Sequence, residues 1–166
     1  KSKMGMYNCA LLMSTGCGTE KNEKKAMEMM KEATGIEDID DADEEHDNWY
    51  SKAIITYGQM LQSINKDKEA EKYFKAAINL GKDNDGDSYY AYAKFLEKKG
   101  NMELALKNYI EASKKGHKMA ANDYAVTLLT KVDGKDPDPA NVKKAIQELR
   151  KASQQNQPAA CTNYGN

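Results

Sequence analysis

The chain has 166 residues, of which 40% are apolar and 31% charged, and its formal net charge is −1. This length and apolar content suit one domain with a buried core, and the chain has no apolar run long enough to predict a membrane span. Near-neutral charge, with Arg150 as the only arginine among 25 basic residues, argues against nucleic acid or an anionic membrane as the main partner.

Helical periodicity predicts four hairpins of two antiparallel helices each. They occupy residues 3–35, 48–81, 87–116 and 118–156, and Pro158 opens the first helix of a fifth. Asn101, the Asp138–Pro139 pair, and either Asp87 or Ser88 are expected to start helices as N-caps. The chain begins without methionine and stops inside the fifth predicted repeat, so we interpret it as a single-domain fragment of a longer array.

An acidic insertion, residues 36–47, separates the first two hairpins and holds eight carboxylates between Glu37 and Asp47. Such a run repels itself and is typical of a solvated segment. A cation site or a docking strip for a basic partner is the alternative, which would make the chain an ion-responsive or enzyme-associated regulatory module.

Three cysteines cannot all pair internally. Cys9 stands at an apolar helix position, where we expect a small buried side chain. A disulfide between Cys9 and Cys17 stays open, because Gly16 permits the helix to end between them.

The hairpins repeat one packing pattern. In the second helices an alanine stands four residues before a large apolar residue, in the pairs Ala26–Met30, Ala70–Phe74, Ala105–Tyr109 and Ala145–Leu149. In the first helices a small residue follows a larger one, in Cys9–Ala10, Tyr57–Gly58, Tyr92–Ala93 and Tyr124–Ala125. Small residues let two helices cross closely, and one hairpin cannot bury both its apolar sides, so the hairpins are expected to stack into one core.

These spacings resemble two related families. The twelve residues from Gly58 to Ala70 resemble the tetratricopeptide repeat, whereas Gly16-x-Gly18 followed by Lys25-Ala26 resembles the Sel1-like repeat. The fourth hairpin departs from both, with VDGKDPDP in its turn. The resemblance implies an all-α protein, an α-solenoid of antiparallel helical hairpins wound into a right-handed superhelix, that serves as a scaffold or adaptor.

Signatures of catalysis are missing from the sequence. It contains no phosphate-binding glycine loop, His-Glu-x-x-His, Cys-x-x-Cys or Gly-x-Ser-x-Gly motif, and its two histidines, His46 and His117, fall in predicted loops. We therefore expect no enzymatic activity, no cofactor and no metal. The absence of an Asn-x-Ser/Thr sequon favours the cytoplasm over a secretory lumen, although targeting signals outside the fragment are left open.

In arrays of this type the first helices line a concave groove. Residues three before and one after each small residue are expected to face it: Tyr7, Leu11, Ile55, Gln59, Tyr90, Lys94, Asn122 and Val126. Residues two before add Asn8, Thr56, Ala91 and Asp123. Such a mixed surface suits a protein or peptide ligand, unless its aromatic and aliphatic members pack against the next repeat instead. A homodimer through the groove or an end repeat is a further possibility, and the carboxylate clamp that grips acidic C-terminal tails is absent.

Overall fold

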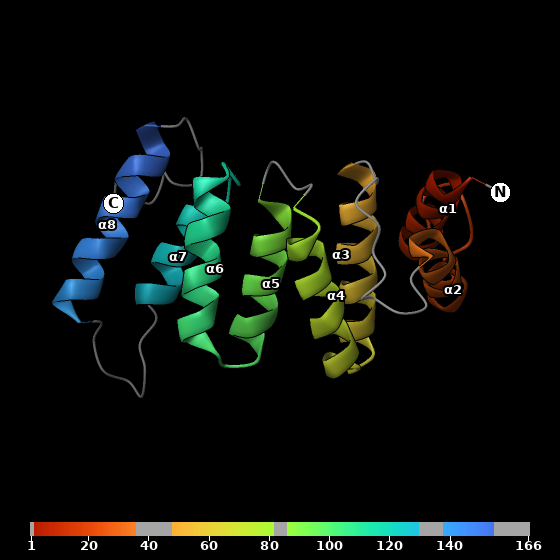
Figure 1. Cartoon of the computed structure of the whole chain (residues 1–166), viewed down its shortest axis with the longest axis horizontal. Helices are drawn as coiled ribbons and strands as arrows, with labels where there is room; N and C mark the ends of the chain where they lie inside the picture. Colours follow the sequence, from red (N-terminus) through yellow and green to blue (C-terminus); the bar gives the residue numbers. More distant parts are fainter. Residues whose placement is uncertain (1, 36–47, 82–85, 130–137, 155–166) are drawn as a thin grey trace. The chain divides into compact units, whose positions relative to one another are not determined.

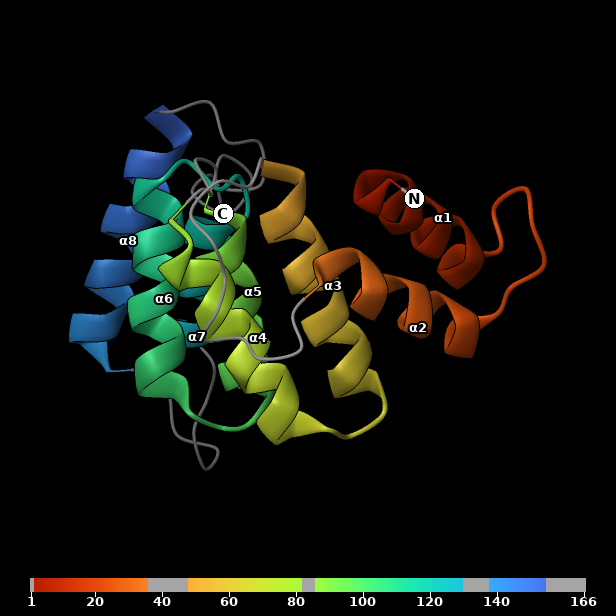
Figure 2. The same ribbon diagram turned by 45° about the vertical axis from the view of Figure 1, so that its right-hand side comes forward.

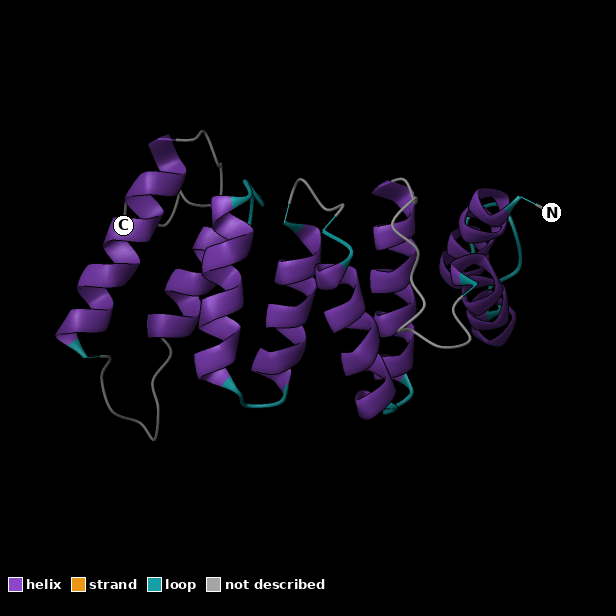
Figure 3. Cartoon of the chain, in the orientation of Figure 1, coloured by secondary structure: helices purple, strands orange, loops and turns teal. Residues whose placement is uncertain are grey.

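A computed structural model describes residues 2–35, 48–81, 86–129 and 138–154. These residues form α-helices joined by turns and loops, without a strand (Figures 1 and 3). The helices are α1 (Lys3–Thr15), α2 (Glu23–Thr34), α3 (Asn48–Ser63), α4 (Asp67–Asn79), α5 (Asp87–Lys98), α6 (Met102–Lys114), α7 (Ala120–Leu129) and α8 (Pro139–Gln154). The all-α hairpin architecture predicted from periodicity is thus confirmed.

The chain divides into two units, Lys1–Asp83 with α1 to α4 and Asn84–Asn166 with α5 to α8. In the first unit α1 pairs with α2 and α3 with α4, and α2 also packs on α3 (Figure 2). In the second unit α5 pairs with α6 and α7 with α8, and α6 packs on α7 (Figure 1). Each unit therefore consists of two stacked helical hairpins.

The repeated small residues lie in the core of these hairpins. Ala26, Ala70, Ala105 and Ala145 are each 0% exposed, and the large residues four positions later are almost fully buried. Gly58 shows why the first helix needs a small residue, since a methyl group added there would lie 3.2 Å from the Phe74 ring. The two helices of a hairpin are close enough that a larger residue at this position would push the partner side chain away.

The expected N-caps are confirmed at two helices and wrong at one. The side chain of Asn101 accepts a hydrogen bond from the Leu104 backbone N–H, and Asp138 Oδ1 accepts one from Ala140 N at 2.8 Å. At α5, however, Asp87 is already helical and the N-cap is Gly86, with a left-handed φ of 80°. A glycine takes this conformation without strain, which is the physical reason for a glycine rather than a side-chain cap at this position.

The prediction that Cys9 is buried is wrong, and the question of a Cys9–Cys17 disulfide, left open by the sequence, is answered by two free thiols. Cys9 is exposed, because it lies on a face of α1 that α2 leaves uncovered, and the Cys9 and Cys17 thiols are not bridged. Within the described ranges no helix combines the length and apolar character that crossing a membrane requires.

The close approach at Gly86 gives a stability prediction. A Cβ atom at Gly86 would lie 2.7 Å from the Ala112 carbonyl oxygen, whereas at Gly100, with a similar φ of 78°, it would meet nothing within 4 Å. We expect Gly100→Ala to cost about 1 kcal/mol through left-handed strain alone, and Gly86→Ala to cost about 1–3 kcal/mol more through the backbone clash. Urea unfolding of both variants measures the difference, and equal destabilisation would contradict the close approach.

Candidate interaction surface

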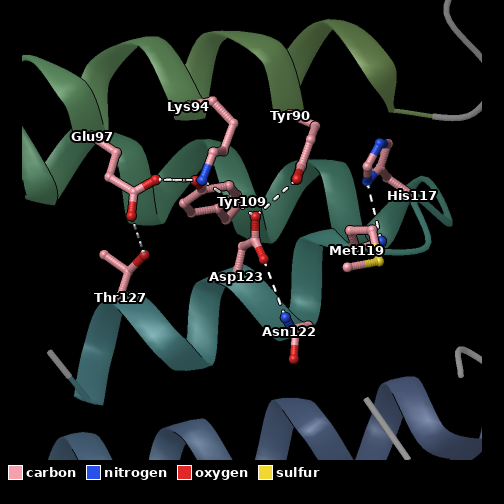
Figure 4. A network of polar contacts seen from close by, with 9 residues as sticks. All are labelled: Tyr90, Lys94, Glu97, Tyr109, His117, Met119, Asn122, Asp123 and Thr127. Atoms are coloured by element: carbon pink, nitrogen blue, oxygen red, sulfur yellow. Dashed lines mark hydrogen bonds and ion pairs between the residues drawn. The ribbon is translucent and has the colours of Figure 1, made fainter. Parts of the chain in front are cut away.

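Three of the residues predicted for the groove contact the carboxylate of a fourth, Asp123, in the second unit (Figure 4). The Tyr90 hydroxyl of α5 donates to Asp123 Oδ2 of α7 at 2.8 Å, and Lys94 Nζ lies 3.5 Å from the same oxygen. Asn122 Nδ2 donates to Asp123 Oδ1 at 3.2 Å. Polar side-chain contacts therefore join the first helices of two successive hairpins, and Tyr90 and Asp123 are 33 residues apart in the sequence.

A second carboxylate, Glu97, continues this network (Figure 4). Its Oε2 accepts a hydrogen bond from the Tyr109 hydroxyl of α6 at 2.7 Å and from Lys94 Nζ at 2.9 Å. Its Oε1 accepts one from Thr127 Oγ1 of α7 at 3.3 Å. Glu97 therefore connects α5, α6 and α7, and Lys94 lies between the two carboxylates.

Neither Glu97 nor Thr127 was predicted as a site residue. Counted from the small residue of its own helix, Glu97 stands four positions after Ala93 and Thr127 two positions after Ala125. Both residues lie one to three positions beyond the predicted groove positions of their helices, and a sequence pattern within one helix does not indicate that they face each other.

Burial and hydrogen bonding set the charge states of the network. Partial burial acts to raise the pKa of Glu97, but the hydrogen bonds from Lys94 and Tyr109 outweigh it and the pKa is lowered. The pKa of Tyr109 is raised by burial and by its hydrogen bond to Glu97, and that of Tyr90 by burial and by Asp123. The pKa of Lys94 is raised, because the two carboxylates outweigh its partial burial. At neutral pH the tyrosines are therefore donors, and one ammonium faces two carboxylates.

His117 extends the network toward the N-terminus of α5. Its ring stacks on Tyr90 at a centroid distance of 3.9 Å, and its Nε2 lies 3.5 Å from Asp87 Oδ1. Its Nδ1 accepts a hydrogen bond from the Met119 backbone N–H at 3.4 Å, in the turn before α7. The Tyr90 ring therefore contacts two other rings, that of His117 and that of Tyr109, whose centroid lies 5.9 Å from its own.

In the first unit the predicted groove residues differ in exposure. Asn8 and Gln59 are exposed, while Tyr7 and Leu11 are half-buried. Ile55 is only 7% exposed and belongs to the core. The Tyr7 ring lies 6.2 Å from that of Trp49, which adds a half-buried tryptophan to this surface.

The other predicted positions also vary. Thr56 is half-buried and donates a hydrogen bond to the Lys52 carbonyl, and Ala91 is 7% exposed. Val126 is 51% exposed on α7. The acidic insertion lies outside the described residues, and among the described ones no group of three histidine, cysteine or acidic side chains is arranged to hold a metal ion.

Comparison with known proteins identifies the fold. No protein-family model and no curated protein matches the chain significantly. Among solved structures, a protective antigen of uropathogenic Escherichia coli strains that displays an SLR fold aligns with a TM-score of 0.70 at 18% identity over 99% of the chain. A Sel1 repeat protein from Oxalobacter formigenes aligns with a TM-score of 0.67 at 19% identity, again over 99% of the chain.

The chain therefore has the helical-repeat fold of Sel1-like repeat proteins, as the resemblance implied. It spans 33% of the length of the first of these two proteins and 62% of the second.

The network around Glu97 predicts a pH-dependent stability. A carboxylate whose pKa is lowered in the folded state stabilises the fold above its unfolded pKa, and this contribution is lost as the pH falls through the folded pKa. We expect Glu97→Gln to lower the free energy of unfolding at neutral pH by about 1–2 kcal/mol. The difference from the wild type should begin to shrink as the pH falls below the ordinary glutamate pKa of 4.5, and it should vanish once the pH is below the lowered pKa of Glu97, where the folded wild type is protonated too.

Glu103→Gln is the matched control for this measurement. Glu103 pairs with Lys107 on the exposed side of α6, so its loss should change stability little at any pH. Denaturant unfolding of the three proteins across the acidic range tests the prediction, which fails if the Glu97→Gln difference is independent of pH.

Proposed function

We propose that the chain is a non-catalytic scaffold or adaptor module that binds a protein partner through the first helix of each hairpin. The observation that carries this proposal is the joint surface of α5 and α7, where Tyr90, Lys94 and Asn122 share one network at partly exposed positions. Because Lys94 is hydrogen-bonded to Glu97 and Tyr90 to Asp123, these two side chains are held in place without a partner. Preorganised side chains lose little entropy on binding.

The chemistry of this surface favours an extended or helical peptide with polar and aliphatic side chains. Asn122 offers an amide, and Val126 adds an aliphatic side chain that is 51% exposed. One lysine against two carboxylates gives the network a formal charge of −1 (+1 from Lys94, −2 from Glu97 and Asp123). A neutral or basic segment is therefore a better match than an acidic one.

In the first unit, Tyr7 and Trp49 supply an aromatic pair, and Asn8 and Gln59 supply exposed amides. Aromatic and amide side chains are common in surfaces that bind peptides, because they combine contact area with hydrogen bonding. The first unit is therefore proposed as a second, separate peptide-binding surface.

The test replaces two amides on the proposed surface. We expect a Gln59→Ala and Asn122→Ala double variant, immobilised on beads, to lose partners that the wild type retains, because two hydrogen-bonding groups are removed. The matched control is Asn108→Ala with Gln147→Ala, which also removes one asparagine and one glutamine side chain, here from the second helices α6 and α8. Quantitative mass spectrometry of the retained proteins compares the three baits.

Thermal unfolding is measured first, and both double variants are expected to be as stable as the wild type. Equal recovery of all partners by the wild type and the Gln59 and Asn122 variant would remove the first helices from consideration. Equal losses in the control would assign binding to another face.

A further inference from the structure

The two carboxylates of the network differ in how fully their oxygens are used, and Glu97 is close to saturation. A carboxylate has about four lone-pair positions that accept hydrogen bonds. In Glu97 three of them are used, by the Tyr109 hydroxyl, the Lys94 ammonium and the Thr127 hydroxyl. The same ammonium, at 2.9 Å, balances the negative charge of Glu97. Glu97 therefore has little capacity left for a donor from a partner.

Asp123 has more acceptor capacity and less charge compensation. It accepts one hydrogen bond on each oxygen, from Tyr90 at Oδ2 and from Asn122 at Oδ1, so each oxygen can accept about one more. Lys94 is the cation paired with Asp123 in the described part of the chain, and its Nζ lies 3.5 Å from Oδ2. This distance exceeds the roughly 2.7–3.2 Å of an N–H···O hydrogen bond. The formal charge of −1 that the network carries is therefore centred on Asp123.

The carboxylate of Asp123 is also fixed in orientation and partly open to solvent. Its two donors act on different oxygens, which holds the plane of the group (Figure 4). Its side chain is 19% exposed. It belongs to α7 and its donor Tyr90 to α5, so the carboxylate lies where two hairpins of the second unit meet. A charge that is partly shielded from water attracts an incoming opposite charge more strongly than one in bulk solvent.

We propose that Asp123 binds an arginine side chain of the peptide partner, with the guanidinium bridging its two oxygens. This inference rests on the proposed function, because it names the group that the partner surface recognises. Arginine fits better than lysine, since its planar fork donates two parallel hydrogen bonds to a carboxylate, whereas an ammonium is a compact point charge. One bound guanidinium changes the formal charge of the network from −1 to 0 (+1 added to −1).

Lys94 competes with the arginine of the partner, because it supplies part of the compensation for Asp123 from 3.5 Å. Lys94→Gln leaves two carboxylates and no cation, a formal charge of −2, so a guanidinium is attracted more strongly. Asp123→Asn acts in the opposite direction. The two variants are thus expected to change affinity in opposite directions, whereas a general loss of structure would lower it in both.

Selection from a phage-displayed library of random linear peptides tests the inference without a known partner. The immobilised wild type is expected to retain peptides in which arginine is enriched at one position over the unselected library. Retention of no peptide above empty beads would contradict the proposed function, and this inference with it. Retained peptides without arginine enrichment would overturn this inference alone and leave the peptide-binding surface in place.

One retained peptide is then synthesised with arginine and with citrulline, a neutral residue of nearly the same shape, and calorimetric titration measures both affinities. Citrulline is expected to weaken binding to the wild type about tenfold or more, because it removes a charge-assisted pair. Asp123→Asn should bind the two peptides equally well. Lys94→Gln should bind the arginine peptide severalfold more tightly than the wild type does.

Glu103→Gln is the matched control, since it removes a carboxylate from the exposed side of α6 and should leave the preference for arginine unchanged. If Asp123→Asn unfolds its unit, the citrulline comparison on the wild type and the Lys94→Gln variant still decide. Equal affinity of the wild type for the two peptides overturns the assignment. So does an arginine preference that persists in Asp123→Asn, or weaker binding of the arginine peptide by Lys94→Gln.

Discussion

The close crossing of two helices inside each hairpin is the constraint on which the rest of the structure depends. It requires a small residue in the first helix and an alanine in the second, and a large side chain such as Phe74 fills the space beside the crossing. Once the two helices are fixed in this way, their registers are fixed too, so the small residue of the first helix and the alanine of the second are buried in every hairpin. The polar network of the second unit is built on this framework, because the crossing of α5 and α6 places Tyr109 beside Glu97.

Much of the fold could be predicted from the sequence because its determinants are local. Asn101 and Asp138 cap helices through residues two or three positions away, and the alanine pattern repeats within single helices. The α5 start was wrong because a left-handed glycine, Gly86, replaced the expected side-chain cap against the backbone of Ala112, far along the chain. Cys9 was wrong for a related reason: its apolar position is visible in the sequence, but whether a neighbouring helix covers it is not.

The candidate site was predictable in part. The offsets identified Tyr90, Lys94 and Asn122, which the structure brings together at Asp123, but they did not reveal that Glu97 and Tyr109 hold this group. Those contacts lie within the α5–α6 hairpin and depend on how its two helices cross, which no local pattern encodes. Ile55 shows the opposite case, because an offset that faces outward on one helix is buried on another. Fold similarity at 18% and 19% identity defines the architecture, and the partner has to be sought from the side chains.

The most direct test of the central constraint compares two Ala→Leu substitutions in the second unit. Ala105 is 0% exposed at the crossing of α5 and α6, whereas Ala140 is exposed in the first turn of α8. The account predicts that Ala105→Leu lowers the free energy of unfolding by about 1–3 kcal/mol or more, and that Ala140→Leu leaves it nearly unchanged. Equal stability of the two variants in denaturant unfolding would contradict it.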